Sequence, residues 1–181
     1  MDVGVFLGRM CPIHLGHQHV IEKMRLDYGR DYLIILGSSN EIITHRNIFS
    51  YRQRTSYIRM VYGETARLIG LGDHGGRNFL DDLAEWLAEL KDTIKLAFYG
   101  QDVHPIFYSG SEFDISFFVN NDMRFKIVNR TGPGSYDVAG EDIRKHLLRE
   151  EHDQLGGLLD PRIIPHVLTD FEQNLKILLS M

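Results

Sequence analysis

The sequence is short of cysteine, of long apolar runs and of surplus positive charge, and each shortage excludes a class of protein. Cys11 is the single cysteine among 181 residues, so neither an intrachain disulfide nor a cysteine-based metal cluster can form. Basic residues number 20 against 25 acidic ones, and the formal net charge of -5 argues against a general nucleic-acid binder. The apolar runs are too short to span a membrane, and the first ten residues lack the basic segment of a signal peptide. We therefore expect a cytoplasmic protein whose partners include neither nucleic acid nor a membrane.

What remains is an ordinary globular composition. Hydrophobic residues make up 43% of the chain and charged residues 25%, which is typical of a chain that buries a core. The sequence contains no internal repeat and no low-complexity tract. At this length a core needs no disulfide or metal to support it, so we expect residues 1–181 to form a single domain.

Short β-rich runs alternate along the chain with segments of helical periodicity. The pattern predicts strands at residues 2–8, 31–39, 66–72, 93–100 and 124–129, and helices at residues 16–29, 50–63, 79–90, 140–148 and 160–179. Residues 101–121 mix turn formers with aromatics and fit neither pattern. The alternation indicates right-handed βαβ units. The expected fold class is α/β: a Rossmann-like, doubly wound parallel sheet of about five strands with C-terminal helices.

Sheets of this kind bind ligands at the carboxyl ends of their strands. Three segments follow expected strands directly, namely Gly8–His17, Gly37–Arg46 and Gly100–Asp102. We therefore expect all three to open onto one edge of the sheet.

The first of these segments carries the clearest chemistry. His14 and His17 flank Gly16 where a strand ends and a helix begins, so both imidazoles can face the space in front of the helix. A helix N-terminus offers unpaired N–H groups and a partial positive charge, both of which favour an anion. Two imidazole donors at that position suit the phosphates of a nucleotide and the charge that develops during phosphoryl-type transfer. A metal site is the alternative, but the His-x-x-His spacing has no evident third protein ligand, and we predict no protein-held metal.

Several segments resemble one family in order along the chain. "GRMCPIHLGH" resembles the opening of the HxGH nucleotidyltransferases, in particular the nicotinamide-nucleotide (NMN) adenylyltransferases of the archaeal and bifunctional bacterial kind. Further resemblances are "GSSNEIITHRNIFSYRQRTSYIRMVYGE", "DDLAEW", "YGQD", "VAGEDIRKHL" and "PRIIPHVLTDF". The departures from the family pattern are Met10 for Phe, Ile48 for Pro, Gln101 for His, Ala139 for Ser and Glu141 for Thr.

The resemblance implies transfer of AMP from ATP to a phosphate acceptor, with NMN as the expected acceptor and NAD and pyrophosphate as products. It implies Mg²⁺ bound through the ATP phosphates, and assembly of the chain into a homo-oligomer. Residue by residue, it implies catalytic roles for His14, His17 and Arg144; ATP contacts from Gly8, Arg9, Gly16, Gly100, Asp102, Ala139, Gly140 and Ile143; and acceptor contacts from Ser38, Asn40, Arg46, Asn47 and Trp86.

Other interpretations stay open at this point. The chain could be a related nucleotidyltransferase that acts on pantetheine phosphate, or a cytidylyltransferase. It could also be a non-catalytic nucleotide-binding regulatory protein, since the segment "VAGEDIR" departs from the family pattern at two positions. Without the family, Trp86 is equally well explained as a core residue and Arg144 as a solvated residue on a helix surface.

Overall fold

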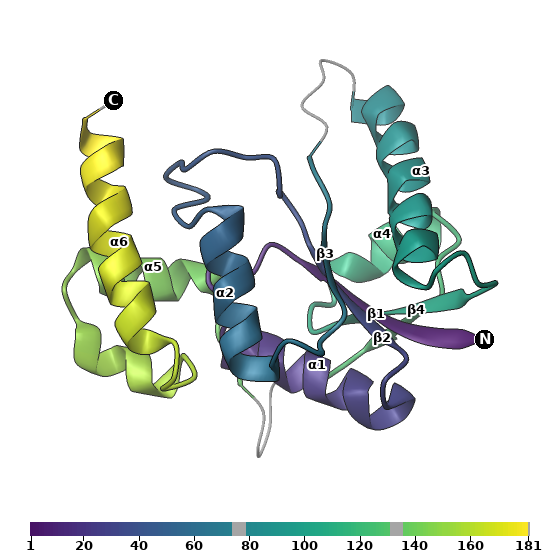
Figure 1. The fold of residues 1–181 in the computed structure, drawn as a ribbon, viewed down its shortest axis with the longest axis horizontal. Coiled ribbons are helices and arrows are strands. Elements are labelled where there is room, and N and C mark those ends of the chain that lie inside the picture. Colours follow the sequence, from purple (N-terminus) through teal and green to yellow (C-terminus); the bar gives the residue numbers. More distant parts are fainter. Residues whose placement is uncertain (74–78, 131–135, 181) are drawn as a thin grey trace.

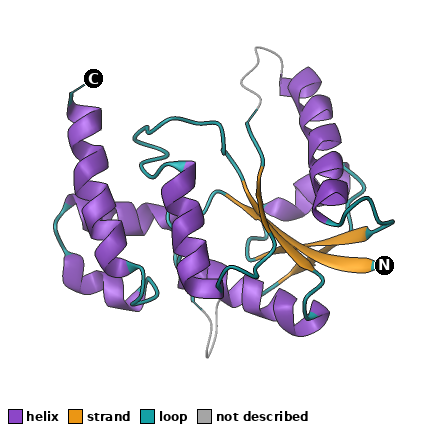
Figure 2. Cartoon of the chain, viewed as in Figure 1, coloured by secondary structure: helices purple, strands orange, loops and turns teal. Residues whose placement is uncertain are grey.

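A computed structural model describes residues 1–73, 79–130 and 136–180 of the chain. Five parallel strands form one sheet in the order β3-β2-β1-β4-β5, with helices on both faces (Figures 1 and 2). The strands are β1 (Asp2–Gly8), β2 (Tyr32–Leu36), β3 (Leu68–Gly70), β4 (His104–Ser109) and β5 (Phe125–Ile127). The α/β class and the doubly wound parallel sheet predicted from the sequence are confirmed.

The central strands are apolar because they are covered on both faces. β1 pairs with β2 from Gly4↔Tyr32 to Gly8↔Leu36, and with β4 from Asp2↔His104 to Phe6↔Tyr108. Since all strands are parallel, their carboxyl ends lie at one edge of the sheet and their amino ends at the other. We call these the carboxyl edge and the amino edge.

Alternate strand residues supply two separate cores. Phe6, Ile34 and Leu36 pack on the face covered by α1 (Leu15–Tyr28) and α2 (Tyr51–Tyr62), together with the C-terminal helices α5 (Gly140–Leu148) and α6 (Ile164–Leu179). Val5 and Ile35 pack on the opposite face, under α3 (Phe79–Ala97) and α4 (Asp114–Asn120). A short 3₁₀ helix, η1 (His152–Gly157), joins α5 to α6. Within the described ranges, no helix combines the length and the apolar character that crossing a bilayer requires.

The two helices beside the site begin at side-chain caps that the sequence encodes. His14 is the N-cap of α1, and its side chain accepts a hydrogen bond from the backbone N–H of His17. α2 begins at the expected capping box, in which Ser50 and Gln53 satisfy each other's backbone N–H groups. Gly63, with a positive φ, ends α2 as expected.

The expected strand at residues 93–100 is wrong, because these residues form the end of α3 and the turn after it. Thr93, Ile94 and Phe98 suggest a strand by composition, yet they are buried at helical spacing, with exposed Lys95 and Leu96 between them. The fourth strand comes later, at His104–Ser109, inside the segment that the sequence left unassigned. α6 also begins later than expected, at Ile164 rather than residue 160.

Candidate active site

Two stacked imidazoles lie at the carboxyl edge, where β1 gives way to α1. The rings of His14 and His17 have centroids 3.6 Å apart and an interplanar angle of 22°. Phe6, from β1, meets the His17 ring edge-on at 5.8 Å between centroids. The two histidines that the sequence singled out are therefore in contact, at the N-terminus of a helix.

The cap at the start of α1 determines where His14 carries its proton. Nδ1 of His14 lies 3.3 Å from the backbone nitrogen of His17 and accepts its hydrogen. In the neutral imidazole the proton then sits on Nε2, which is left as a donor. Burial lowers the pKa of His14 to about 3, and the Arg130 guanidinium contributes in the same direction. Burial also lowers the pKa of His17 well below its usual value, with further contributions from His14 and Arg130.

The surroundings of Gly16 leave no room for a side chain. A Cβ at this position would lie 3.0 Å from the carbonyl oxygen of Tyr136 and 3.1 Å from Nδ1 of His14. Any side chain would push the helix start away from the segment that passes over it or disturb the histidine cap. The glycine thus allows the segment that precedes α5 to approach the start of α1.

A cavity of about 210 Å³ opens beside His17 at the carboxyl edge. Gly8 and Gly16 line one side, and Arg130, which follows β5, lines another. Nε of Arg130 donates to the carbonyl of Gly110 at 2.8 Å, and a Cβ on Gly110 would lie 2.4 Å from the Arg130 side chain. Gly110 therefore leaves room for the Arg130 side chain at the end of β4, from where the guanidinium acts on both imidazoles.

Arg130 and the turn Ser109–Ser111 were missed by sequence reasoning. Ser109, Gly110 and Ser111 line the same cavity, and the Ser109 hydroxyl donates to Asp114. They were missed because β4 was placed too early in the chain. Arg130 could have been found, since it follows the correctly predicted fifth strand and the carboxyl-end rule applies to it.

α5 brings its N-terminus to the loop between β1 and α1. Nη1 of Arg144 lies 3.4 Å from the carbonyl oxygen of Cys11, to which it donates. Gly140 lies at the same place, since a Cβ on it would be 3.7 Å from the Cys11 oxygen. Ala139 is the N-cap and offers no side-chain cap, whereas Ile143 is fully buried in the core, so its side chain is a packing group.

Arg144 thus contacts the loop that leads to His14, but the small cavity beside His17 is lined by Arg130. Glu141, which replaces a threonine of the family pattern, forms an ion pair with Lys145 at 3.0 Å. The hydrogen bond from Lys145 lowers the pKa of the Glu141 carboxyl. The Lys145 ammonium on the same helix therefore offsets the charge of this exposed carboxylate.

Three of the expected acceptor residues meet around the end of β3. The Ser38 hydroxyl donates to the Asp73 carboxylate, and Asn40 exchanges two hydrogen bonds with the Asp73 backbone, at 2.9 Å and 2.8 Å. Nε1 of Trp86 donates to the carbonyl of Gly72 at 3.2 Å. Trp86 also packs edge-on against Phe117, so its ring is partly a core group.

The loop after β2 holds the other two acceptor candidates differently. Arg46 is exposed, whereas Asn47 is fully buried. Neither polar atom of the Asn47 side chain has a hydrogen-bond partner among the described residues, and the same holds for Nε of Arg9 and Nδ1 of His17. Buried polar atoms normally have partners. These unpaired atoms of Asn47, Arg9 and His17 belong to segments that follow β1 and β2, where a polar ligand could supply the missing hydrogen bonds.

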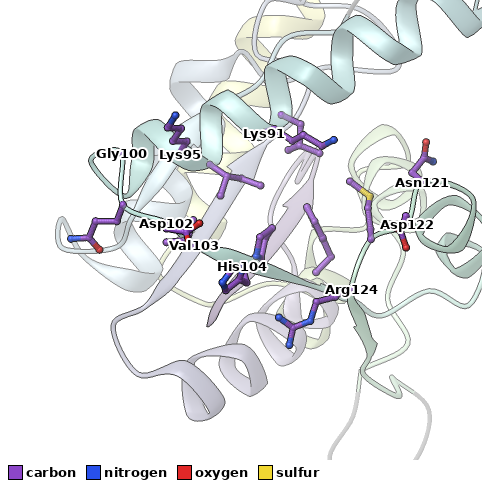
Figure 3. A pocket seen from close by; sticks show the side chains of 15 residues that line it. Lys91, Lys95, Gly100, Asp102, Val103, His104, Asn121, Asp122 and Arg124 are labelled. Atoms are coloured by element: carbon purple, nitrogen blue, oxygen red, sulfur yellow. The ribbon is translucent and has the colours of Figure 1, made fainter. Parts of the chain in front are cut away.

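Gly100 and Asp102 do not belong to this edge, which corrects the expectation for the adenosine pocket. The carbonyl of Asp102 accepts from the N-terminal ammonium of Met1 at 3.0 Å, and His104 opposite Asp2 begins β4, so both residues lie at the amino edge. They line a groove of about 650 Å³ between α3, the start of β4 and the turn before β5 (Figure 3). This groove is larger than the cavity beside His17, but it lies a full strand length away from the imidazoles.

No group of three or more His, Cys, Asp or Glu side chains in residues 1–73, 79–130 and 136–180 has an arrangement that could hold a metal ion. The cavity beside His17 is lined by the Arg130 guanidinium, which stays protonated and suits phosphate oxygens, and a neutral imidazole can also donate one hydrogen bond to such an oxygen.

Comparisons with known proteins agree with this geometry. Residues 5–75, which begin within β1 and contain α1, β2, α2 and β3, match the model of the cytidylyltransferase-like family. A curated relative, the nicotinamide-nucleotide adenylyltransferase of Saccharolobus solfataricus, is 41% identical over 59 residues, which cover 33% of this chain and 34% of that protein.

Solved structures share the fold over nearly the whole chain. A bifunctional NMN adenylyltransferase/ADP ribose pyrophosphatase from Francisella tularensis superposes with a TM-score of 0.77 at 16% identity. Its complex with AMP and a manganese ion gives a TM-score of 0.71 at 19% identity. Each comparison covers 99% of this chain and 52% of the other, so the chain spans about half the length of these proteins.

These comparisons agree with the resemblance seen in the sequence, over part of the chain in sequence and over nearly all of it in fold. The chain shares its fold with a solved bifunctional NMN adenylyltransferase/ADP ribose pyrophosphatase, and the segment that matches the cytidylyltransferase-like family contains the two stacked histidines at the carboxyl edge.

Proposed function

We propose that this chain is an adenylyltransferase that transfers AMP from ATP to NMN, giving NAD and pyrophosphate. A phosphate oxygen of the acceptor attacks the α-phosphorus of ATP in line. The bond between the α-phosphorus and the oxygen that bridges to the β-phosphate breaks, and pyrophosphate leaves with that electron pair. Because the acceptor phosphate is already anionic near neutral pH, the reaction needs no strong general base.

Catalysis in this proposal is positioning together with stabilisation of charge. His14 donates from Nε2 to a phosphate oxygen, because its Nδ1 is occupied by the α1 cap. His17, stacked on His14, lines the cavity at the carboxyl edge from the first turn of the helix. Both imidazoles are neutral in the free protein, and a polyanion beside them favours their protonated form. Binding of the triphosphate would then favour protonation of the two imidazoles, and their positive charge would lie beside the phosphates, where negative charge develops in the transition state.

The remaining groups divide between the two substrates. Arg130 in the cavity, Arg144 beside the β1–α1 loop and Arg9, whose buried Nε has no partner among the described residues, serve the triphosphate. Ser38, Asn40 and Trp86, gathered around the end of β3, serve the acceptor, with Asn47 and Arg46 on the neighbouring loop. Gly100 and Asp102 are not part of the proposed site.

A divalent cation, Mg²⁺ in this proposal, would be bound by the phosphates of ATP and by water. It would neutralise part of the triphosphate charge and help the pyrophosphate to leave. The residues present fit this arrangement, since the described part of the chain offers cationic and neutral donors here rather than a set of carboxylate ligands.

The single observation that carries the proposal is the stacked pair of capped and buried imidazoles at the start of α1, within a family match that covers the same segment. The test is pyrophosphate release with ATP or CTP and a panel of acceptors: NMN, nicotinate mononucleotide, pantetheine phosphate and choline phosphate. We expect release with ATP and NMN, and a loss of at least about 100-fold in turnover in His17→Ala.

The same assay separates the alternatives. Release with CTP, or with another acceptor in preference to NMN, would assign a different nucleotidyltransferase. Tight ATP binding with no release for any acceptor would indicate a regulatory nucleotide-binding protein. Near-normal turnover in His17→Ala would remove that imidazole from the mechanism.

A further inference from the structure

A fully buried arginine on α2 binds the backbone of both turns at the carboxyl edge. Arg54 is 0% exposed. Its Nη1 donates to the carbonyl oxygens of Arg9 at 2.7 Å and Gly37 at 2.8 Å, and its Nη2 donates to that of Ser38 at 2.8 Å. One guanidinium thus joins the turn after β1 to the turn after β2.

The two turns belong to the two sides of the proposed site. The phosphate-side turn, residues 8–14, contains Arg9 and leads to His14. The acceptor-side turn, residues 37–40, contains Ser38 and Asn40, which bind Asp73. The turns also touch directly, since the N–H of Gly37 donates to the carbonyl of Gly8 at 3.0 Å.

Both turns contain a backbone conformation that needs external support. Met10 has φ 48° and Ser38 has φ 52°, in the left-handed region that residues other than glycine rarely adopt. Arg54 holds the carbonyl immediately before Met10, the one immediately before Ser38 and that of Ser38 itself. Strained conformations persist at functional sites when the surrounding contacts fix them, and these contacts come from one side chain.

A lysine could not replace these contacts. The planar guanidinium presents separate terminal nitrogens to carbonyls on two different segments, whereas an ammonium is a single point of donation. No carboxylate in residues 1–73, 79–130 and 136–180 forms an ion pair with Arg54. Its hydrogen bonds go to the three carbonyls of the two turns, while Glu41 and Asp73 favour its charge from a distance.

We propose that Arg54 is a positioning residue that holds the phosphate side and the acceptor side of the site in a fixed relative position. By holding the backbone of both turns, it fixes the distance between the residues that bind the triphosphate and those that bind the acceptor. This inference rests on the proposed function for its kinetic test, but not for its structural test. Neither substrate contacts the Arg54 guanidinium in this account.

The kinetic test compares two arginines of the same helix. Arg59 also lies on α2 and also donates to three backbone carbonyls, those of Gly63, Glu64 and Ala66, but in the loop after the helix. Arg54→Lys should raise the KM for ATP and the KM for NMN together, each by about tenfold or more, since charged hydrogen bonds to both turns are lost. Arg59→Lys should leave both KM values within about twofold of wild type. A rise in only one KM, or equal effects of the two variants, would overturn the proposal.

Amide hydrogen exchange tests the same inference without turnover. In the absence of ligand, residues 8–14 and 37–40 should exchange faster in Arg54→Lys than in Arg59→Lys. In the wild-type protein, ATP alone should slow exchange in the acceptor-side turn as well as in the phosphate-side turn. This second measurement decides the matter even where Arg54→Lys does not fold. If ATP protects only the phosphate-side turn of the wild-type protein, the two turns are not coupled and the proposal is refuted. Absence of pyrophosphate release would refute only the proposed function.

Discussion

The histidine cap of α1 predicts a loss of stability in mild acid that can be calculated from the structure. His14 is 2% exposed, and burial lowers its pKa to about 3 from the 6.5 of a histidine in water. Between those two values the unfolded chain binds a proton that the folded chain does not, so the free energy of unfolding falls as the pH falls below about 6.5. From about pH 7.5 to about pH 5.5 this single group removes about 1.4 kcal/mol. His17 acts in the same direction, since its pKa is also lowered.

The variant that tests this prediction is His14→Asn. Asparagine is a good N-cap, so its side-chain oxygen can still accept from the His17 N–H, but it does not titrate. Urea unfolding at pH 7.5 and at pH 5.5 gives the decrease in the free energy of unfolding between the two values. We expect this decrease to be smaller in His14→Asn than in wild type by about 1.4 kcal/mol, the contribution of one histidine. The control is His166→Asn, the same substitution at an exposed position on α6, and it should leave the pH-dependent loss of stability at its wild-type size. An unchanged loss in His14→Asn would refute the burial argument.

Three further predictions follow from the same edge of the sheet. Gly16→Ala should destabilise the fold by about 1–3 kcal/mol in denaturant unfolding, because its Cβ meets the Tyr136 carbonyl, while Gly156→Ala, which faces open space, should change stability by less than about 0.5 kcal/mol. Asp73→Asn should raise the KM for NMN several-fold and leave the KM for ATP unchanged, because it weakens the bond from Ser38; an equal rise in both would contradict the division of the site. Arg130→Gln should raise the pKa of both His14 and His17 in a ¹⁵N NMR titration, since the guanidinium now disfavours their charged forms; no shift would place Arg130 too far away to act.

Much of this site follows from local sequence signals. The apolar run of β1, the cap at His14 and the Ser50–Gln53 capping box are short-range features, and each predicted element lies where expected. The carboxyl-end rule then brings the segment at His14 and the segment at Ser38 to one edge, as the parallel pairing of β1 and β2 bears out.

The rest of the site depends on contacts between distant segments. Residues 93–100 contain β-branched and aromatic side chains, but their burial follows the helical period of α3, and tertiary packing overrides composition there. The error moved Gly100 and Asp102 to the wrong edge and concealed the turn at Ser109–Ser111. Arg54 was visible only as part of a family motif, because the carbonyls that it binds lie 16 to 45 residues away in the chain.

The most direct test asks which edge of the sheet receives the triphosphate. The molecule offers a histidine marker at each edge: His14 and His17 at the carboxyl edge, and His104 in the larger groove at the amino edge. In ¹⁵N-histidine-labelled protein, addition of ATP should shift the imidazole resonances of His14 and His17 and leave that of His104 in place. A shift of His104, with His14 and His17 unmoved, would contradict the account.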